Sequence, residues 1–240
     1  MSQNITSIWV YLAQTPLLWL AMTLAVYQVA YQIYRRMRFA PIFNPVLIAV
    51  VLLVALLTIT GTPYQRYFDG AQFVHFLLGP ATVSLAIPLY SSYGTLRRRL
   101  GPVAGALLVG SLTGVLSAGL IGRALGLAPQ TLLSMLPKSV TTPIAMGISE
   151  QLGGLPSLTA VLVILTGIVG SIVGPRALDL LRVEDDSVRG FALGIASHGI
   201  GTARSLQISE EAGAFAGLAM GLNGAVTTLL APLLVWLVRG

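Results

Sequence analysis

Long uncharged stretches alternate with short clusters of charged residues along the whole chain. Asp, Glu, Lys and Arg are absent from five stretches, 39–65, 70–96, 100–122, 151–175 and 212–238. A helix that crosses the hydrocarbon core of a bilayer needs about 20 mostly apolar residues. Each stretch is long enough, so the pattern predicts an all-α polytopic membrane protein.

The apolar segments and their polar borders predict seven or eight membrane segments in one transmembrane domain over residues 1–240. Their boundaries carry an error of about 2–4 residues. No basic region precedes the first segment, so we expect no cleavable signal there. The expected segments cover 8–34, 44–61, 71–93, 101–127, 131–152, 156–175, 190–208 and 211–238.

Composition then narrows the function classes. The chain is 55% hydrophobic and only 9% charged, whereas soluble domains carry about 25% charged residues. The absence of cysteine excludes disulfides, thiolate metal sites and a cysteine nucleophile. The two histidines lack ligand-like spacing and no nucleophile–base pair is present, so we expect no metal, no cofactor and no enzymatic activity. The net charge of +6 indicates cytoplasmic loops and not nucleic-acid binding.

Basic clusters orient the segments. Arginines at 35, 36 and 38 follow the first segment, and arginines at 97, 98 and 99 follow the third, so the positive-inside rule places both clusters in the cytoplasm and the N-terminus outside. The loop 176–189 carries three more arginines. It lies inside only if an earlier segment fails to cross, and 131–152 is the best candidate for a re-entrant segment.

That segment contains Lys138, the only lysine of the chain, in the sequence PKSVTTP. A proline inside a helix costs about 3 kcal/mol, so Pro137 and Pro143 predict an interrupted helix. A lysine at membrane depth costs at least about 2.5 kcal/mol. Lys138 therefore either faces a polar cavity and binds an anion or snorkels from a shallow segment to the interface. The hydroxyl groups beside it belong to Ser139, Thr141 and Thr142.

A second polar cluster lies in 194–211, where glycines predict an unwound crossing. A half-helix that starts near Gly201 or Thr202 would direct free N–H groups toward an anion. Arg204 either grips a carboxylate or pairs with Glu210 or Glu211. The candidate anion ligands of this cluster are His198, Gly199, Gly201, Thr202 and Arg204, and the alternative for His198 is a satisfied helix contact.

Two further polar residues leave alternatives open. Glu150 either carries a coupling proton, as His198 also could, or caps a segment at the surface. Asn223 is either a substrate ligand or a helix–helix hydrogen bond, of which the second is commoner. The proline-containing segments 78–92 and 135–149 resemble each other, which is typical of broken helices in repeat-built transporters.

The motifs LPKSVTTPIAMGISEQLGGLPSLTA and ASHGIGTARSLQISEEAGAFAGLAMGLNGAVTTLLAPL resemble the signature regions of the LrgB/CidB family, and the likeness extends over nearly the whole chain. That family is similar to the C-terminal half of the plastidial glycolate/glycerate translocator of plants. The resemblance implies an inverted-repeat, elevator-like fold with crossed broken helices in the cell inner membrane. It also implies a small LrgA/CidA-like membrane protein as partner.

Some members of this family are linked to pyruvate uptake, and others are named for effects on murein hydrolases and cell lysis. We therefore expect a secondary transporter of small monocarboxylates such as glycolate, glycerate, pyruvate or lactate, with proton coupling and a homo-oligomer as open points. Lys138 and Arg204 would share the carboxylate of this small organic anion. The alternative is a holin/antiholin-like regulator of lysis, which needs no convergent anion site.

Overall fold

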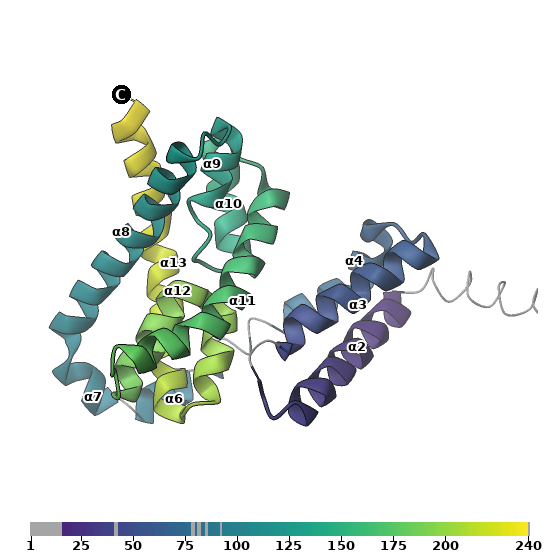
Figure 1. Cartoon of the computed structure of the whole chain (residues 1–240), viewed down its shortest axis with the longest axis horizontal. Coiled ribbons are helices and arrows are strands. Elements are labelled where there is room, and N and C mark those ends of the chain that lie inside the picture. Colours follow the sequence, from purple (N-terminus) through teal and green to yellow (C-terminus); the bar gives the residue numbers. More distant parts are fainter. Residues whose placement is uncertain are drawn as a thin grey trace, which may run out of the picture. The chain divides into compact units, whose positions relative to one another are not determined.

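The computed structural model describes residues 16–40, 43–77, 80, 83, 84, 86–91 and 93–239. All regular structure among them is helical. The chain forms two compact units, residues 1–83 and 84–240, and each is described by itself (Figure 1). The expectation of a single domain stays a prediction.

The first unit packs three helices, α2 (Pro16–Arg36), α3 (Pro45–Thr60) and α4 (Tyr64–Phe76). Asn44 caps α3 by accepting hydrogen bonds from the N–H groups of its first turn, which a helix start otherwise leaves unpaired. α4 lies against the start of α2, where a side chain at Gly70 would collide with the backbone of Pro16. Trp19 is fully buried beside Tyr67.

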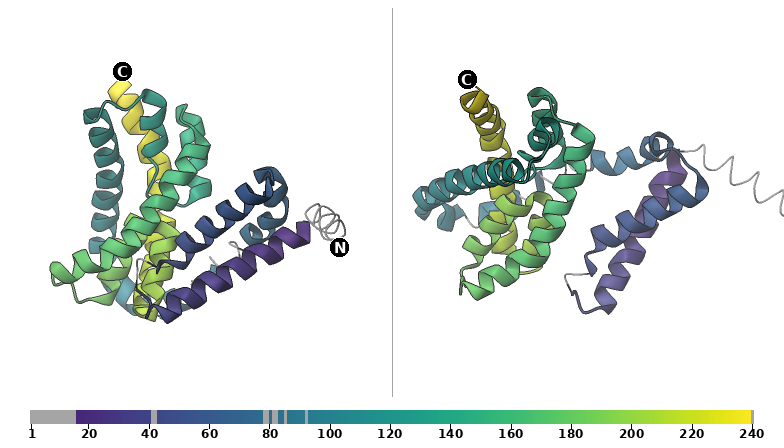
Figure 2. Two further views of the ribbon diagram at one scale, coloured as in Figure 1. Left: turned by 45° about the vertical axis from the view of Figure 1, so that its right-hand side comes forward. Right: turned by 45° about the horizontal axis from the view of Figure 1, so that its top comes forward.

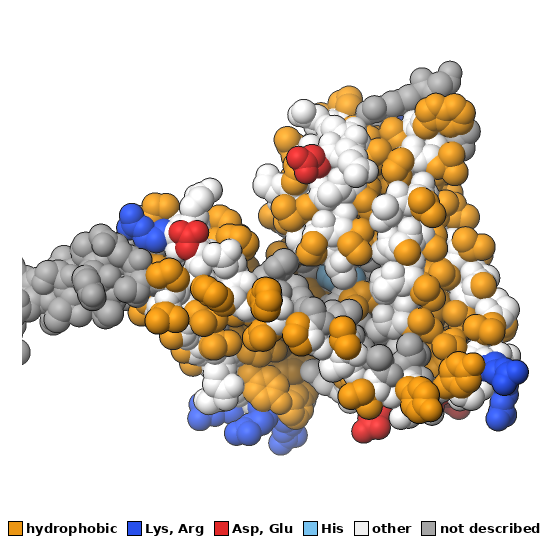
Figure 3. Space-filling view, turned by 180° about the vertical axis from the view of Figure 1, so that it is seen from behind, with side chains coloured by type: hydrophobic (Ala, Val, Ile, Leu, Met, Phe, Trp, Pro, Cys, Tyr) orange, Lys and Arg blue, Asp and Glu red, His pale blue; other side chains and the backbone are white. Residues whose placement is uncertain are grey.

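Three long helices form the frame of the second unit, namely α8 (Leu100–Ala124), α11 (Pro156–Leu180) and α13 (Glu210–Arg239). The short helices α6 (Ala86–Ser91) and α7 (Tyr93–Arg98) precede them. Together with α2, these three are long and apolar enough to cross a membrane. Hydrophobic side chains are spread over the whole visible face of this unit, and a group of basic side chains lies at its lower end (Figure 3). The chain is thus a multi-pass membrane protein.

Between α8 and α11 the chain forms a helical hairpin, here called hairpin 1. It consists of α9 (Pro129–Met135), the non-helical residues 136–141 and α10 (Thr142–Leu152). Its two arms meet at Thr159 of α11, whose hydroxyl lies 2.9 Å from the Ser134 carbonyl and 2.7 Å from the Ser149 hydroxyl. The interruption predicted from Pro137 and Pro143 is therefore confirmed, and the segment 131–152 returns to the end from which it came.

Between α11 and α13 lies hairpin 2, formed by α12 (Asp186–Leu206). The helix breaks at His198, where φ is 42° and ψ is −130°, and residues 186–197 and 199–206 are its two arms. A side chain at Gly201 would collide with the Leu193 carbonyl, although residues eight apart in a straight helix are separated by about 12 Å. The arms therefore lie side by side, and the expected crossing at 190–208 is instead a reversal.

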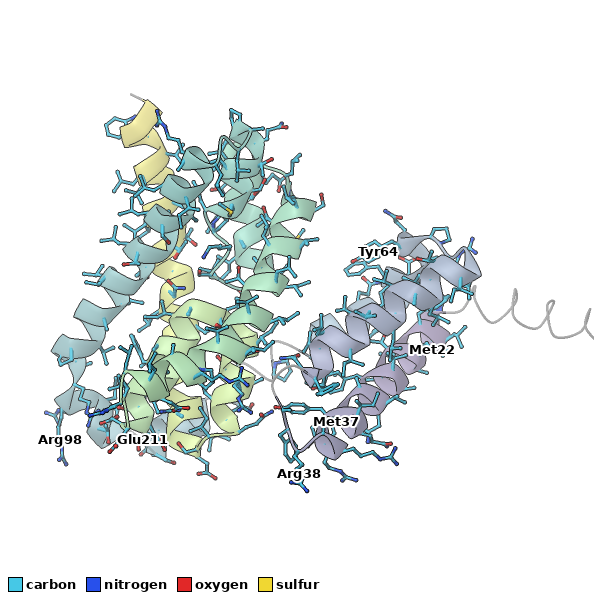
Figure 4. All side chains as sticks on the ribbon, viewed as in Figure 1. Met22, Met37, Arg38, Tyr64, Arg98 and Glu211 are labelled. Carbon is cyan, nitrogen blue, oxygen red and sulfur yellow. The ribbon has the colours of Figure 1, made fainter. Side chains whose placement is uncertain are left out.

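The two hairpins enter from opposite ends of the unit. α9 and α10 lie toward the end that carries the C-terminus, whereas α6 and α7 lie at the other end (Figures 1 and 2). Arg98 and Glu211 share that other end (Figure 4). Arg99 also forms an ion pair of 2.6 Å with Asp185, in the short loop before α12. This pair confirms that the loop lies beside the basic cluster 97–99, as expected if 131–152 does not cross.

Each hairpin is followed by a crossing helix, and the two hairpin–helix pairs share a sequence pattern at a spacing of 60 residues. Ile148, Ser149 and Glu150 correspond to Ile208, Ser209 and Glu210, and Thr142 and Gly153 correspond to Thr202 and Gly213. At this spacing Lys138 of hairpin 1 corresponds to His198 of hairpin 2, and Val163 of α11 corresponds to Asn223 of α13. The repeat is thus carried by residues 129–180 and 186–239.

Three expectations need correction. Residues 71–93 do not form one span, because α4 ends at Phe76 and the separate helix α6 starts at Ala86. The loop expected at 176–189 is shorter, since α11 continues through Pro175 to Leu180. The half-helix expected near Gly201 starts already at Gly199, because the chain reverses within one residue. Residues 78, 79, 81, 82, 85 and 92 lie outside the described residues, and the resemblance between 78–92 and 135–149 stays a prediction.

Candidate functional site

The tips of the two hairpins meet near the middle of the crossing helices, at Asn223. Its Nδ2 donates to the Ser139 carbonyl at 3.2 Å and to the Ile195 carbonyl at 3.1 Å. Its Oδ1 accepts from Ser111 of α8 at 2.7 Å and from Thr227 at 3.2 Å. Asn223 is fully buried, and all four of its hydrogen-bonding positions are used. It therefore matches the alternative of a helix-to-helix hydrogen bond.

The depth of this meeting point follows from the neighbours of Ser139. A side chain at Gly114 of α8 would lie 3.6 Å from the Ser139 hydroxyl. At 1.5 Å per residue, Gly114 lies about 15 Å from the end of α8 at Ala124 and about 21 Å from its start at Leu100. A bilayer core is about 30 Å thick, so the tip of hairpin 1 reaches the central part of a bilayer and is not shallow.

Lys138 sits at this tip, half-buried, with its Nζ 3.3 Å from the neighbouring Ser139 hydroxyl. The ion pairs of the described residues are Arg99–Asp185 and Arg189–Asp179, so no described carboxylate neutralises it. An ammonium in such a position is costly unless an anion pairs with it. Its depth and lack of a carboxylate partner favour anion binding over snorkelling to the interface.

Lys138 and Ser139 line a cavity of about 680 Å³. The cavity follows one face of α8 and one face of the first arm of hairpin 2. Arg99 and Ser187 line it at the basic end of the unit, and apolar side chains such as Val103, Ile195 and Phe215 line it elsewhere. A hydrophilic solute that entered the cavity would therefore find polar groups mainly at its two ends.

Arg99 and Asp185 carry the electrostatics of that basic end. Arg99 Nη1 donates to Asp185 at 2.6 Å and to the Ser187 hydroxyl at 2.6 Å. Asp185 also caps α12 by accepting from the N–H groups of Ser187 and Val188. The hydrogen bond from Ser187 and the contact with Arg99 lower the pKa of Asp185 from its ordinary 3.8 to about 2. The Arg99 side chain is 39% exposed and lies beside the cavity.

His198 forms the tip of hairpin 2, buried against α11. Its Nε2 lies 3.0 Å from the Val163 carbonyl, and because a carbonyl only accepts, Nε2 carries the hydrogen. A positive φ in a residue other than glycine costs about 1–3 kcal/mol, so the surrounding contacts must hold this conformation. His198 thus matches the alternative in which its imidazole makes a hydrogen bond between two helices. Its role in coupling stays a prediction.

The remaining predicted site residues distribute between the two tips and the arms. Thr202 is buried and donates to the His198 carbonyl, whereas Gly199 is exposed. Gly201 is packed against Leu193. Thr141 and Thr142 are half-buried at the start of α10, and Thr141 makes no side-chain capping bond.

Arg204 and Glu150 lie away from the tips. Arg204 is half-buried on the returning arm of hairpin 2, and its Nη1 donates to Gln207 at 2.8 Å. It does not line the cavity that Lys138 lines, so a carboxylate shared by the two stays a prediction. Glu150 is exposed near the end of α10, which matches the alternative of a surface position.

Sequence reasoning missed several buried hydroxyl groups. Ser111 reaches Asn223, and Ser134 and Ser149 tie hairpin 1 to Thr159. Ser197, beside the tip of hairpin 2, is fully buried and its hydroxyl has no partner among the described residues. The repeat at a spacing of 60 residues would have drawn attention to Ser149, because the triplet Ile-Ser-Glu recurs there. Nothing local distinguishes Ser111.

Comparisons with known proteins agree on one family. The LrgB-like family profile matches residues 23–237. Uncharacterized protein YxaC of Bacillus subtilis (strain 168) is 38% identical over 216 residues, 90% of this chain and 94% of YxaC. Uncharacterized protein YwbG of the same strain is 36% identical over 217 residues, 90% of this chain and 96% of YwbG.

A further relative carries a functional name. The antiholin-like protein LrgB of Bacillus cereus (strain B4264) is 31% identical over 219 residues, 91% of this chain and 95% of that protein. No solved structure matches the chain. The family profile and the relatives match this chain over nearly its full length, including both signature motifs. The chain therefore belongs to the LrgB-like family of membrane proteins.

Proposed function

We propose that the protein is a secondary transporter of small monocarboxylates such as glycolate, glycerate, pyruvate or lactate across the cell inner membrane. The observation that carries the proposal is Lys138, a cation at mid-membrane depth without a described carboxylate partner, in the wall of a cavity. An intramembrane ionisable residue usually marks a substrate or ion pathway. A monocarboxylate supplies the one negative charge that Lys138 lacks.

The order of elements supports an inverted-repeat transporter. The first hairpin–helix pair enters from one end of the unit and the second enters from the other, and they share residues at a spacing of 60. Transporters built in this way bind their substrate at the interface of the repeats, near the membrane midplane. An elevator-like movement would carry such a site between the two faces.

Lys138 and Ser139 provide a charge and a hydroxyl for the acid, and the start of α10 provides two further groups. Thr141 and Thr142 bear hydroxyls, and the first N–H groups of a helix favour an anion. We assign the carboxylate to Lys138 and the α10 start, and a substrate hydroxyl or keto group to the hydroxyls. Arg204 would join only if the returning arm of hairpin 2 shifts toward the cavity.

The cavity supports a route from the basic end of the unit to Lys138, since Arg99 and Lys138 both line it. Positive charge in a cleft raises the local concentration of anions. For coupling, His198 at the tip is a better candidate than the exposed Glu150. A small LrgA/CidA-like membrane protein as partner and a homo-oligomer belong to the proposal as well.

The name of the Bacillus cereus relative favours a second candidate, an antiholin-like regulator of murein hydrolase activity and cell lysis. The name of the family denotes no enzymatic activity. A lesion-forming protein gains nothing from a half-buried lysine without a described carboxylate partner on a hairpin tip, so the geometry gives more support to transport.

Uptake of radiolabelled acids into proteoliposomes tests the proposal. The purified full chain, with and without an LrgA/CidA-like protein, should show saturable uptake of at least one of the four acids. The Lys138→Gln variant, reconstituted to the same density, is the matched control and should show an uptake lowered about 100-fold. Release of an uncharged dye without acid uptake would instead support the second candidate.

A further inference from the structure

Asn223 lies where a substrate ligand was expected, but every hydrogen-bonding position of its amide is already used within the protein. The side chain is 1% exposed. Both N–H groups and both acceptor positions of the amide are used by Ser139, Ile195, Ser111 and Thr227. An amide has no further capacity, so Asn223 acts on a bound acid only through the residues that it holds.

The two bonds from Nδ2 connect elements that the chain does not connect directly. Ser139 belongs to the tip of hairpin 1, and Ile195 lies in the last turn of the first arm of hairpin 2. Because the bonds of 3.2 and 3.1 Å share one nitrogen, the two carbonyl oxygens lie at most 6.3 Å apart. Carbonyls where a helix ends lack an intrahelical donor, and in a membrane such groups need a partner within the protein. Asn223 is that partner for both tips.

The repeat shows what is particular to Asn223. Its equivalent in α11 is Val163, whose main-chain carbonyl meets His198 of hairpin 2. Each crossing helix thus holds, at the equivalent position, the tip of the hairpin from the other repeat. On α11 this contact uses the backbone and reaches one tip. On α13 it uses a side chain that reaches both tips and, through Ser111, also α8.

We propose that Asn223 is the positioning residue of the substrate site, which holds the tips of both hairpins in the arrangement that binds the acid. The inference rests on the proposed function, in which Lys138 binds the carboxylate. By fixing the Ser139 carbonyl, Asn223 fixes the backbone next to Lys138. By fixing the Ile195 carbonyl, it keeps the opposite tip beside Lys138 and closes the site.

Cysteine labelling tests this independently of transport, because the native chain has no cysteine. Single cysteines at Ser139 and Ala196, which both line the cavity, report on the two tips in the purified full chain. Asn223→Asp removes the donors but keeps an acceptor for Ser111 and Thr227, and Asn223→Ala removes both. The rate of maleimide labelling should rise about tenfold at both positions in either variant.

Two controls separate positioning from general loosening. Thr227→Val removes one bond to Oδ1 and leaves both tip bonds, so labelling at Ser139→Cys and Ala196→Cys should stay within about twofold of the parent rate. A cysteine at the exposed Ala203, on the returning arm of hairpin 2, should label equally fast with and without the Asn223 substitution.

Faster labelling at one tip only, or at neither, would overturn the shared role. Faster labelling at Ala203 as well, or loss of the monodisperse gel-filtration peak in both Asn223 variants, would overturn it too, since Asn223 would then be a general folding residue. Pyruvate or glycolate should slow labelling at Ala196→Cys in the parent protein but not in Asn223→Asp. Absence of this protection with the tenfold change intact would count against the proposed substrates and leave the role of Asn223 standing.

Discussion

Hairpin 1 reverses over residues 136–141, none of which has a positive φ, whereas hairpin 2 reverses at His198 alone with a φ of 42°. The wide tip of hairpin 1 presents a charge to a cavity. The narrow tip of hairpin 2 buries its imidazole and leaves the Ser197 hydroxyl without a described partner. Equivalent positions of the repeat thus differ in their surroundings, since Lys138 lines a cavity whereas His198 is buried against the Val163 carbonyl.

The same contrast extends to how each hairpin is held. Hairpin 1 is tied to α11 by hydroxyl groups, through Ser134, Ser149 and Thr159. Hairpin 2 is held by close backbone packing, because side chains at Gly190 and Gly194 would collide with the carbonyls of Ala212 and Ala216 in α13. The tip that exposes a charged side chain to the cavity therefore has no residue with a positive φ, and the positive φ lies in the closely packed tip.

The largest expected difference is between neutral substitutions of the two equivalent tip residues, Lys138 and His198. One should affect acid uptake and the other should affect stability. Lys138→Gln should lower acid uptake about 100-fold, since truncating one partner of a buried charge pair costs about 2–5 kcal/mol. Its melting temperature should not fall, because an uncompensated charge is removed. His198→Ala should instead destabilise the fold by about 1–3 kcal/mol through the unpaired Val163 carbonyl.

Uptake and thermal unfolding in detergent, measured on both variants, check this expectation. The assignment of roles would be wrong if Lys138→Gln melted lower and His198→Ala lost uptake without a change in melting temperature.

A pair of glycine substitutions tests the packing of the two hairpins. Gly170→Ala in α11 would bring a methyl group into collision with Ser197 and should destabilise the protein by about 1–3 kcal/mol. Gly147→Ala, in the returning arm of hairpin 1, meets nothing within 4 Å and should be neutral or stabilising by up to about 1 kcal/mol. Denaturant or thermal unfolding of both variants measures their stability relative to the parent. An equal change of stability in the two variants would contradict this expectation.

Arg204 decides whether the returning arm of hairpin 2 takes part in binding. Because Arg204 donates to Gln207 and does not line the cavity, Arg204→Gln should lower acid affinity by no more than about tenfold. Its effect should add to that of a milder change at the tip of hairpin 1, Lys138→Arg. Competition binding with the single and double variants measures the coupling, and residues that share one carboxylate would be strongly non-additive.

The smallest effect concerns the basic end of the unit, where Asp185 anchors the start of hairpin 2. Its pKa is lowered to about 2 from 3.8, so the native state favours the ionised form. The resulting stabilisation is complete above about pH 4 and disappears as the pH falls through about 2. Asp185→Asn should therefore melt below the parent at pH 6, and the difference should vanish near pH 2. A difference in melting temperature that is the same at pH 6 and near pH 2 would show that Asp185 stabilises the protein by packing and not by its charge.

Local sequence features were sufficient to predict the interruption in hairpin 1. Pro137 and Pro143 break any helix that contains them, and Lys138 between them identifies a polar environment. The arginines at 97–99 and in the loop after α11 then favoured a return of 131–152 to its own side. Each of these inferences depends on one residue type in one place, which is why the sequence was enough.

Hairpin 2 was predicted only in part. The glycines of 194–201 indicated a break, but its reversal depends on contacts of Gly190 and Gly194 with residues 22 positions further along the chain, which no local pattern reports. The role of Asn223 depends on partners as far as 112 residues away. The wrong span at 71–93 shows that an apolar run sets a maximum length for a helix and not its ends.

The glycine contacts between hairpin 2 and α13 also constrain biogenesis. Residues 186–206 leave the ribosome before Ala212, Ala216 and Asn223 exist as partners for Gly190, Gly194 and Ile195. Until α13 has been synthesised, the backbone carbonyl at Ile195 has no donor from Asn223, and lipid offers none. Hairpin 2 therefore reaches its final packing only after the last helix of the chain has been synthesised.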